Sequence, residues 1–161
     1  MTSCAALIVA AGRGSRFGGP LPKQYALLGA QTVLRRTLEV LRATMGIDRL
    51  QVVIAAGDEA HYEAAVAGLD LPPPVIGGAS RQRSVLNGLE ALAADAPDLV
   101  AIHDAARPFV RTSDIMACLE AVGPGVDGVV LGVPMADTLK RVDAEGRLAG
   151  TVPRDNLWRA Q

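Results

Sequence analysis

The sequence has few aromatic residues, few cysteines and almost no lysine. Aromatic residues make up 3% of the chain, and its two cysteines, Cys4 and Cys118, stand far apart in apolar stretches. Such cysteines have neither metal-ligand spacing nor a disulfide framework, so we expect free thiols in a reducing compartment. Of the 16 basic residues only Lys23 and Lys140 are lysines. Because lysine and arginine bind phosphate differently, both lysines are candidates for a specific role.

The chain also lacks a basic excess and a long apolar run. Its net charge is −1, which argues against a nucleic-acid-binding surface because duplex binding usually requires many cations. The N-terminal apolar run at residues 4–11 follows no basic segment and is too short for a signal peptide or a membrane span. Half of the residues are hydrophobic and a fifth are charged, enough for a buried core. We therefore expect a folded cytoplasmic protein that binds neither nucleic acid nor membrane.

Strand-like and helix-like segments alternate over the first 133 residues. This order predicts an α/β fold with a mostly parallel sheet flanked by helices, in which ligands bind at the carboxyl ends of the strands. The expected strands are 5–10, 50–56, 74–76, 99–103 and 126–133, and the expected helices are 32–45, 58–67, 80–94 and 112–122.

The pattern changes after Pro134. Residues 137–142 and 147–152 flank a polar turn at 143–146, which predicts a protruding β-hairpin arm at about 136–155. Residues 156–161 begin an amphipathic segment that has no capping or stop residue. We therefore expect one domain over residues 1–161, truncated at its C-terminus.

A glycine-rich loop follows the first strand. Gly12 and Gly14 allow backbone N–H groups to approach an anion closely. Pro20 and Pro22 prevent an immediate helix, so the loop matches neither a dinucleotide fingerprint nor a P-loop. The loop carries two cations, Arg16 and Lys23. Two cations on such a loop indicate a triphosphate whose leaving pyrophosphate they stabilise.

Two further clusters follow later strands. At residues 77–85, Gly78 permits the close approach of a flat ring and Ser84 directs a hydroxyl toward the junction, although helix capping alone also explains this segment. At residues 103–108, Asp104 is placed to bind a magnesium ion held between phosphates, with Arg107 beside it. A structural salt bridge explains that pair equally well. We assign no chemistry to His103.

Together these segments resemble the 2-C-methyl-D-erythritol 4-phosphate cytidylyltransferases of the non-mevalonate isoprenoid pathway. The resemblance covers nearly the whole chain, in five segments that occur in the family's order. They are AAGRGSR with PKQY (10–16 and 22–25), GGASRQRSV (77–85), HDAARP (103–108), DTLK (137–140) and TVPRDNLW (151–158).

The resemblance implies a Rossmann-like nucleotidyltransferase fold and a homodimer joined through the hairpin arms. It implies that CMP passes from CTP to the phosphate of 2-C-methyl-D-erythritol 4-phosphate, a polyol phosphate, with release of pyrophosphate. The site residues carried over are catalytic Arg16 and Lys23; nucleotide-binding Ala10, Ala11, Gly12, Gly14, Gly78 and Ser84; substrate-binding Arg107, Thr138 and Arg154; and Asp104 for Mg2+ or another divalent cation. Thr138 and Arg154 would reach over from the partner subunit.

Two departures from the family pattern matter. Ala79 stands where some members carry an acidic residue, and the family continues beyond the segment that contains Trp158. The chain is therefore predicted to be a piece of the single-domain enzyme, or of its fusion with the cyclodiphosphate synthase, and to be weakly active or inactive alone. Two other readings stay open. A ribitol 5-phosphate cytidylyltransferase shares nearly all these motifs, and a non-catalytic nucleotide-binding module would keep the fold without turnover.

Overall fold

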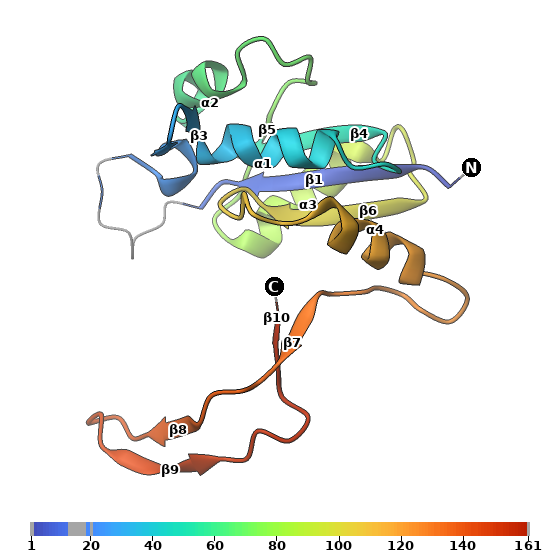
Figure 1. The fold of residues 1–161 in the computed structure, drawn as a ribbon. Helices are drawn as coiled ribbons and strands as arrows, with labels where there is room; N and C mark the ends of the chain where they lie inside the picture. Colours follow the sequence, from blue (N-terminus) through green and yellow to red (C-terminus); the bar gives the residue numbers. More distant parts are fainter. Residues whose placement is uncertain (1, 13–18, 20, 161) are drawn as a thin grey trace. The chain divides into compact units, whose positions relative to one another are not determined.

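The structure is a computed structural model and describes residues 2–12, 19 and 21–160 (Figure 1). The chain divides into two compact units, Met1–Leu119 and Glu120–Gln161. The first unit contains a parallel sheet with the strand order β5-β4-β1-β6. The strands are β1 (Cys4–Ala10), β4 (Arg49–Ile54), β5 (Val75–Ile76) and β6 (Leu99–Asp104). The expected α/β fold with a parallel sheet is therefore confirmed.

Helices cover both faces of this sheet, and the side chains of β1 alternate between them. Ala6 and Ile8 pack in a core with α1 (Val33–Arg42), α2 (Glu59–Val66) and α4 (Thr112–Ala121). Ala5 and Leu7 pack in a second core that includes Leu92 of α3 (Arg81–Leu92). Because both of its faces are buried, β1 reads as a continuous apolar run, as expected of a central parallel strand.

Helix boundaries in the first unit follow from capping residues. Thr32 accepts a hydrogen bond from the Arg35 N–H at 3.1 Å, and Ser80 accepts one from the Arg83 N–H at 3.1 Å. These contacts satisfy N–H groups that the first helical turn leaves unpaired, so α1 and α3 begin at the next residue. A short antiparallel pair of strands, β2 (Leu27–Leu28) and β3 (Gln31–Thr32), leads into α1.

The second unit holds two antiparallel strand pairs. β8 (Leu139–Val142) pairs with β9 (Leu148–Val152), so the predicted hairpin is confirmed. β7 (Gly132–Pro134) pairs with β10 (Trp158–Ala160). The prediction of a strand over residues 126–133 that continues the parallel series is wrong for most of that length. Its apolar pattern is typical of a strand, but only its last two residues gain a pairing partner, and that partner is antiparallel and lies near the end of the chain.

No helix in the described part of the chain has the length and apolar character needed to cross a bilayer.

Gly88 lets α3 approach the sheet closely. A Cβ atom at this position would lie 2.4 Å from Cδ1 of Leu7 and 2.8 Å from Cγ2 of Val53. Both are branched side chains that are fully buried, so neither has room to move.

Replacing Gly88 with alanine is therefore expected to lower the free energy of unfolding by roughly 1–3 kcal/mol, even though alanine favours a helix. Chemical denaturation measures this change. Gly123→Ala is the control, because nothing lies within 4 Å of a Cβ atom there. Unchanged stability of the Gly88 variant would show that the helix moves away from the sheet without cost.

Candidate functional site

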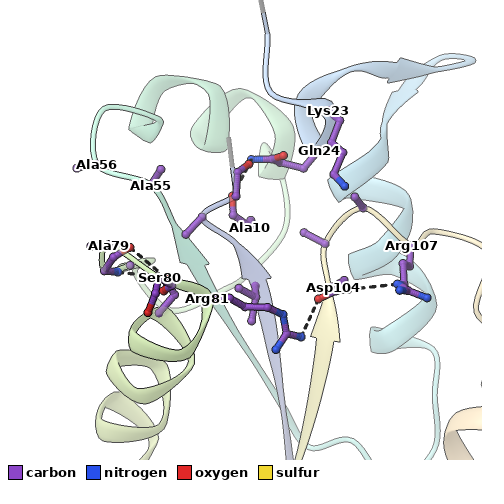
Figure 2. Close-up of a pocket in the computed structure, with 18 residues that line it drawn as sticks. Ala10, Lys23, Gln24, Ala55, Ala56, Ala79, Ser80, Arg81, Asp104 and Arg107 are labelled. Carbon is purple, nitrogen blue, oxygen red and sulfur yellow. Dashed lines mark hydrogen bonds and ion pairs between the residues drawn. The ribbon is translucent and has the colours of Figure 1, made fainter. Parts of the chain in front are cut away.

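A pocket of about 800 Å³ lies at the carboxyl ends of the parallel strands (Figure 2). It is lined by segments that follow four of them: residues 10–12 after β1, 55–56 after β4, 77–81 after β5 and 104–107 at the end of β6. Its volume lies in the range of small-molecule sites, about 300–1,000 Å³. The three clusters expected at strand ends thus line one pocket.

The glycine-rich loop contributes only in part to what the structure describes. The predictions for Gly14 and Arg16 lie outside the described residues. Ala10, Ala11 and Gly12 line the pocket at the start of the loop. Lys23 lines it from the far end of the loop, where Lys23–Tyr25 form a single 3-10 turn. The side chain of Lys23 is exposed, as required of a cation that meets a ligand.

Asp104 lies between two arginines. Its Oδ1 accepts a hydrogen bond from Nη2 of Arg81 at 2.9 Å, and its Oδ2 accepts one from Nε of Arg107 at 3.2 Å (Figure 2). Burial alone would raise the pKa of the Asp104 carboxyl, but the hydrogen bonds and charges of Arg81 and Arg107 outweigh it and lower the pKa. Asp104 is therefore an ionised carboxylate at neutral pH, suited to bind a cation.

The junction between β5 and α3 is held by Ser84. The Ser84 hydroxyl accepts a hydrogen bond from the Gly78 N–H at 3.1 Å and donates to the Ser80 carbonyl at 2.9 Å. Ser84 is buried, and its Oγ would lie 2.7 Å from a Cβ atom placed on Gly77. The hydroxyl thus holds the glycine turn against the first turn of α3, beside the start of the glycine-rich loop.

His103 is not among the described residues that line the pocket. Burial lowers the pKa of its imidazole, although the neighbouring Arg107 carbonyl and Asp104 act in the opposite direction. Its Nε2 lies 3.1 Å from the Arg107 carbonyl oxygen. A neutral ring that donates to this carbonyl supports the turn after β6.

The donor set of the pocket fits a magnesium ion held jointly with phosphates. The described residues contain no group of three histidine, cysteine, aspartate or glutamate side chains that could hold a metal alone. Asp104 is the one carboxylate among the lining residues that the structure describes. Mg2+ is typically bound by one or two carboxylates, with the remaining ligands from water and substrate phosphates. A single carboxylate beside cationic side chains matches that arrangement.

A family model described as "IspD: 2-C-methyl-D-erythritol 4-phosphate cytidylyltransferase" matches residues 4–161. The chain belongs to the IspD family.

Relatives of this IspD chain include both fused and single enzymes. The "Bifunctional enzyme IspD/IspF" of Rhizorhabdus wittichii is 48% identical over 159 residues, which are 99% of this chain and 40% of that protein. The 2-C-methyl-D-erythritol 4-phosphate cytidylyltransferase of Xylella fastidiosa is 48% identical over 158 residues, which are 96% of this chain and 68% of that protein. The chain thus spans about two fifths of the bifunctional relative.

Solved structures show the same fold. A crystal structure of 4-diphosphocytidyl-2C-methyl-D-erythritol synthase matches with a TM-score of 0.84 and 32% identity, over 100% of this chain and 72% of the other. The 2-C-methyl-D-erythritol 4-phosphate cytidylyltransferase of Francisella tularensis matches with a TM-score of 0.73 and 28% identity, over 99% of this chain and 70% of the other. The predicted nucleotidyltransferase fold is therefore confirmed.

Two predicted site residues of this IspD chain lie in the second unit. Thr138 is exposed just before β8, and Arg154 is exposed just after β9. Nη1 of Arg154 donates a hydrogen bond to the Ala136 carbonyl and so links the two ends of the hairpin. Both residues thus belong to the base of the hairpin, and their binding of a substrate phosphate stays a prediction.

Two residues of the site had no predicted role. One is Arg81, whose Nη2 contacts Asp104. The other is Gln24, which follows Lys23 in the chain. Its side chain is buried and contacts the start of the glycine-rich loop. A glutamine in a short polar segment gives no sign of burial in the sequence. The sequence signal for Arg81 was its position three residues after Gly78, in the segment that follows a strand.

Proposed function

We propose that the protein containing this chain transfers CMP from CTP to the phosphate of 2-C-methyl-D-erythritol 4-phosphate and releases pyrophosphate. The observation that carries this proposal is the placement of Lys23 and Asp104 in one pocket with the backbone of residues 10–12 and 77–78, in a chain of the IspD family. A cation, a carboxylate for a metal and open backbone groups are the parts that nucleotidyl transfer uses.

The reaction needs positioning and charge neutralisation rather than a general base. A phosphate monoester is already ionised at neutral pH, so its oxygen can attack the α-phosphorus of CTP directly. The bond from the α-phosphorus to the bridging oxygen breaks, and pyrophosphate leaves with its electron pair. Lys23, with Arg16, offsets the negative charge that grows on the α-phosphate and the leaving group. The pocket's described lining contains no histidine, which agrees with this chemistry.

The remaining residues would bind the two substrates. Small residues at 10–12 and Gly78 leave room for the cytosine ring against the backbone. Arg107 would hold the substrate phosphate beside Asp104. The proposed nucleotide-binding residues are Ala10, Ala11, Gly12, Gly14, Gly78 and Ser84, and the proposed phosphate-binding residues are Arg107, Thr138 and Arg154.

Asp104 would hold the divalent cation, for which we propose Mg2+. When bound, the cation offsets phosphate charge and fixes the triphosphate in its reactive orientation. Arg81 and Arg107 already occupy both carboxylate oxygens. Each oxygen accepts only one of these contacts and keeps a further lone pair, through which Asp104 would hold the cation beside the two arginines.

We also propose a homodimer and a cytoplasmic location. The hairpin exposes large apolar side chains, including Val142 and Leu148, and a second copy of the chain is the proposed partner that covers them. In such a dimer Thr138 and Arg154 would serve the partner's site. The free thiols of Cys4 and Cys118 suit a reducing compartment, and CTP is supplied in the cytoplasm.

The test is pyrophosphate release by the full-length protein with CTP and Mg2+. With 2-C-methyl-D-erythritol 4-phosphate as acceptor, we expect kcat/KM to exceed that with ribitol 5-phosphate by at least about 100-fold, which corresponds to about 2.7 kcal/mol of transition-state discrimination. A preference for ribitol 5-phosphate would replace the proposed acceptor. CTP binding without pyrophosphate release on either acceptor would show a non-catalytic nucleotide-binding module instead.

A further inference from the structure

Gln24 lies inside the protein at the end of the glycine-rich loop. Its side chain is 2% exposed. Its Nε2 donates hydrogen bonds to the Ala10 carbonyl at 2.6 Å and to the Gly12 carbonyl at 3.2 Å. One side-chain amide therefore contacts two carbonyls at the start of the loop, 12 and 14 residues earlier in the chain. Figure 2 shows the side chain of Gln24 reaching toward Ala10, whereas the side chain of Lys23 points in a different direction.

The turn that carries Gln24 has a second buried anchor. In the 3-10 turn, the Tyr25 N–H donates to the Pro22 carbonyl at 2.9 Å and the Ala26 N–H donates to the Lys23 carbonyl at 3.2 Å. The Tyr25 ring is buried in the core that includes residues of β1, α1 and α2, with its centroid 5.6 Å from that of His61 in α2. Tyr25 and Gln24 thus anchor the backbone of the turn in the interior. Lys23 and Gln24 both line the pocket, and Lys23 is the one of the two whose side chain is exposed.

The contacts of Gln24 lie where the sheet ends. Ala10 is the last residue of β1 and pairs with Ile54, the last residue of β4. Gly12 lies beyond the strand, in the segment that lines the pocket. A carbonyl past the end of a strand has no ladder partner and needs another donor. Gln24 supplies that donor and so fixes the backbone of Ala10 and Gly12.

We propose that Gln24 is a positioning residue for CMP transfer, which holds Lys23 in fixed register with the backbone of Ala10 and Gly12. This inference rests on the proposed function. In that reaction Lys23 stabilises charge on the α-phosphate while residues 10–12 contact the nucleotide. Gln24 joins these two parts directly, because it follows Lys23 in the chain and its side-chain amide donates to the Ala10 and Gly12 carbonyls. A shift of Lys23 by about 1 Å from its productive position is enough to cost on the order of 100-fold in rate.

The chemistry of the two acceptors explains why the residue is a glutamine. Both partners are carbonyl oxygens, so the side chain must donate. A glutamate of the same size would turn carboxylate oxygens toward those carbonyls and repel them. Only the protonated glutamic acid would donate again, through its single O–H. Burial raises the pKa of such a carboxyl above its usual value of about 4.3, so the contact would return as the pH is lowered.

Gln51 supplies a matched control for a purely structural glutamine. It is also 2% exposed, and its Nε2 donates to the Pro73 carbonyl at 3.0 Å and to the Val52 carbonyl at 3.4 Å. Gln51 does not line the pocket. Glutamate at either position therefore places a carboxylate against backbone carbonyls, but only position 24 lies beside Lys23.

The experiment compares Gln24→Glu, Gln24→Met and Gln51→Glu in the full-length protein, by steady-state pyrophosphate release from pH 6 to pH 8. Methionine keeps the length of the side chain without a donor or a charge, and it covers the case in which Gln24→Glu does not fold. For Gln24→Glu we expect kcat to fall on the order of 100-fold at pH 8, with the ratio to wild type recovering about tenfold at pH 6. For Gln24→Met we expect at least a tenfold fall at all pH values, with KM for CTP changed less than about threefold.

Gln51→Glu is expected to unfold at a lower temperature but to keep the kcat of its folded fraction at every pH. The inference is overturned if Gln24→Met keeps kcat within about twofold of wild type. It is also overturned if folded Gln24→Glu has a kcat, relative to wild type, that does not change with pH. A loss of kcat in Gln51→Glu as large as that in Gln24→Met would overturn it as well. A wild-type protein that releases no pyrophosphate would contradict the proposed function itself, and this result is distinct because it precedes any comparison of variants.

Discussion

Replacement of Lys23 by methionine is expected to lower kcat for pyrophosphate release by roughly 10²–10³-fold, with a much smaller change in KM for CTP. The reason is that charge on the α-phosphate and the leaving group grows most in the transition state, so a cation there stabilises the transition state more than bound CTP. Steady-state kinetics of the full-length protein at saturating Mg2+ separates the two constants.

The control for this variant is Arg42→Met. Arg42 is an exposed cation in the last turn of α1 and does not line the pocket. The substitution removes one positive charge, as Lys23→Met does, and is expected to leave kcat within about twofold of wild type. Equal losses in 1/KM and kcat/KM for Lys23→Met, with kcat unchanged, would show instead that the lysine only binds the nucleotide.

Replacement of Asp104 by asparagine is expected to lower kcat/KM by about 100-fold or more and to raise the Mg2+ concentration needed for half-maximal activity. Asparagine keeps one carbonyl oxygen but no charge, so it is a poorer magnesium ligand. It also leaves Arg81 and Arg107 without the anion between them. Since these arginines lower the pKa of Asp104, the wild-type residue is ionised throughout the neutral range. The defect is therefore expected at every pH from 6 to 8.

A second aspartate with the same kind of partner serves as the control. Asp114 accepts hydrogen bonds from Nε and Nη2 of Arg111 at 3.0 and 3.1 Å, three residues away, as Arg107 is from Asp104. Asp114→Asn removes an exposed ion pair, which contributes little, and should change neither kcat/KM nor the Mg2+ requirement. If Asp104→Asn loses activity with an unchanged Mg2+ requirement, Asp104 acts as a structural salt bridge, as the sequence alone also allowed.

Much of the first unit follows from local sequence signals. The apolar run of residues 4–10 indicates β1, and the capping residues Thr32 and Ser80 mark the starts of α1 and α3. These elements therefore begin and end close to the expected residues. The meeting of Gly78 and Asp104 in one pocket follows from strand order, since carboxyl ends of parallel strands share one edge. Because element order is enough for this step, the position of the site could be predicted without side-chain detail.

The contacts within the site could not be predicted in the same way. Whether Arg81 is solvated or bound to Asp104 depends on how far α3 lies from β6, which no local pattern specifies. Gln24 is buried by a turn whose position follows from the packing of Tyr25 rather than from its own polarity. The prediction of a strand at 126–133 was wrong for a related reason. An apolar run indicates a strand, but whether it pairs, and with which strand, depends on residues elsewhere in the chain.

The pairing of Asp104 with two arginines has a consequence for how ligands arrive. Among the described residues that line the pocket, Lys23, Arg81 and Arg107 are cationic and Asp104 is the one anion. These four side chains sum to +2 (three cations and one anion), whereas the chain as a whole carries a net charge of −1, so the described lining is more positive than the rest of the chain. A polyanion that diffuses nearby is therefore attracted to the pocket more than to the rest of the surface. In the proposed reaction, the positive charge that neutralises phosphate would thus also direct the encounter, over the range of about 8 Å that physiological salt permits.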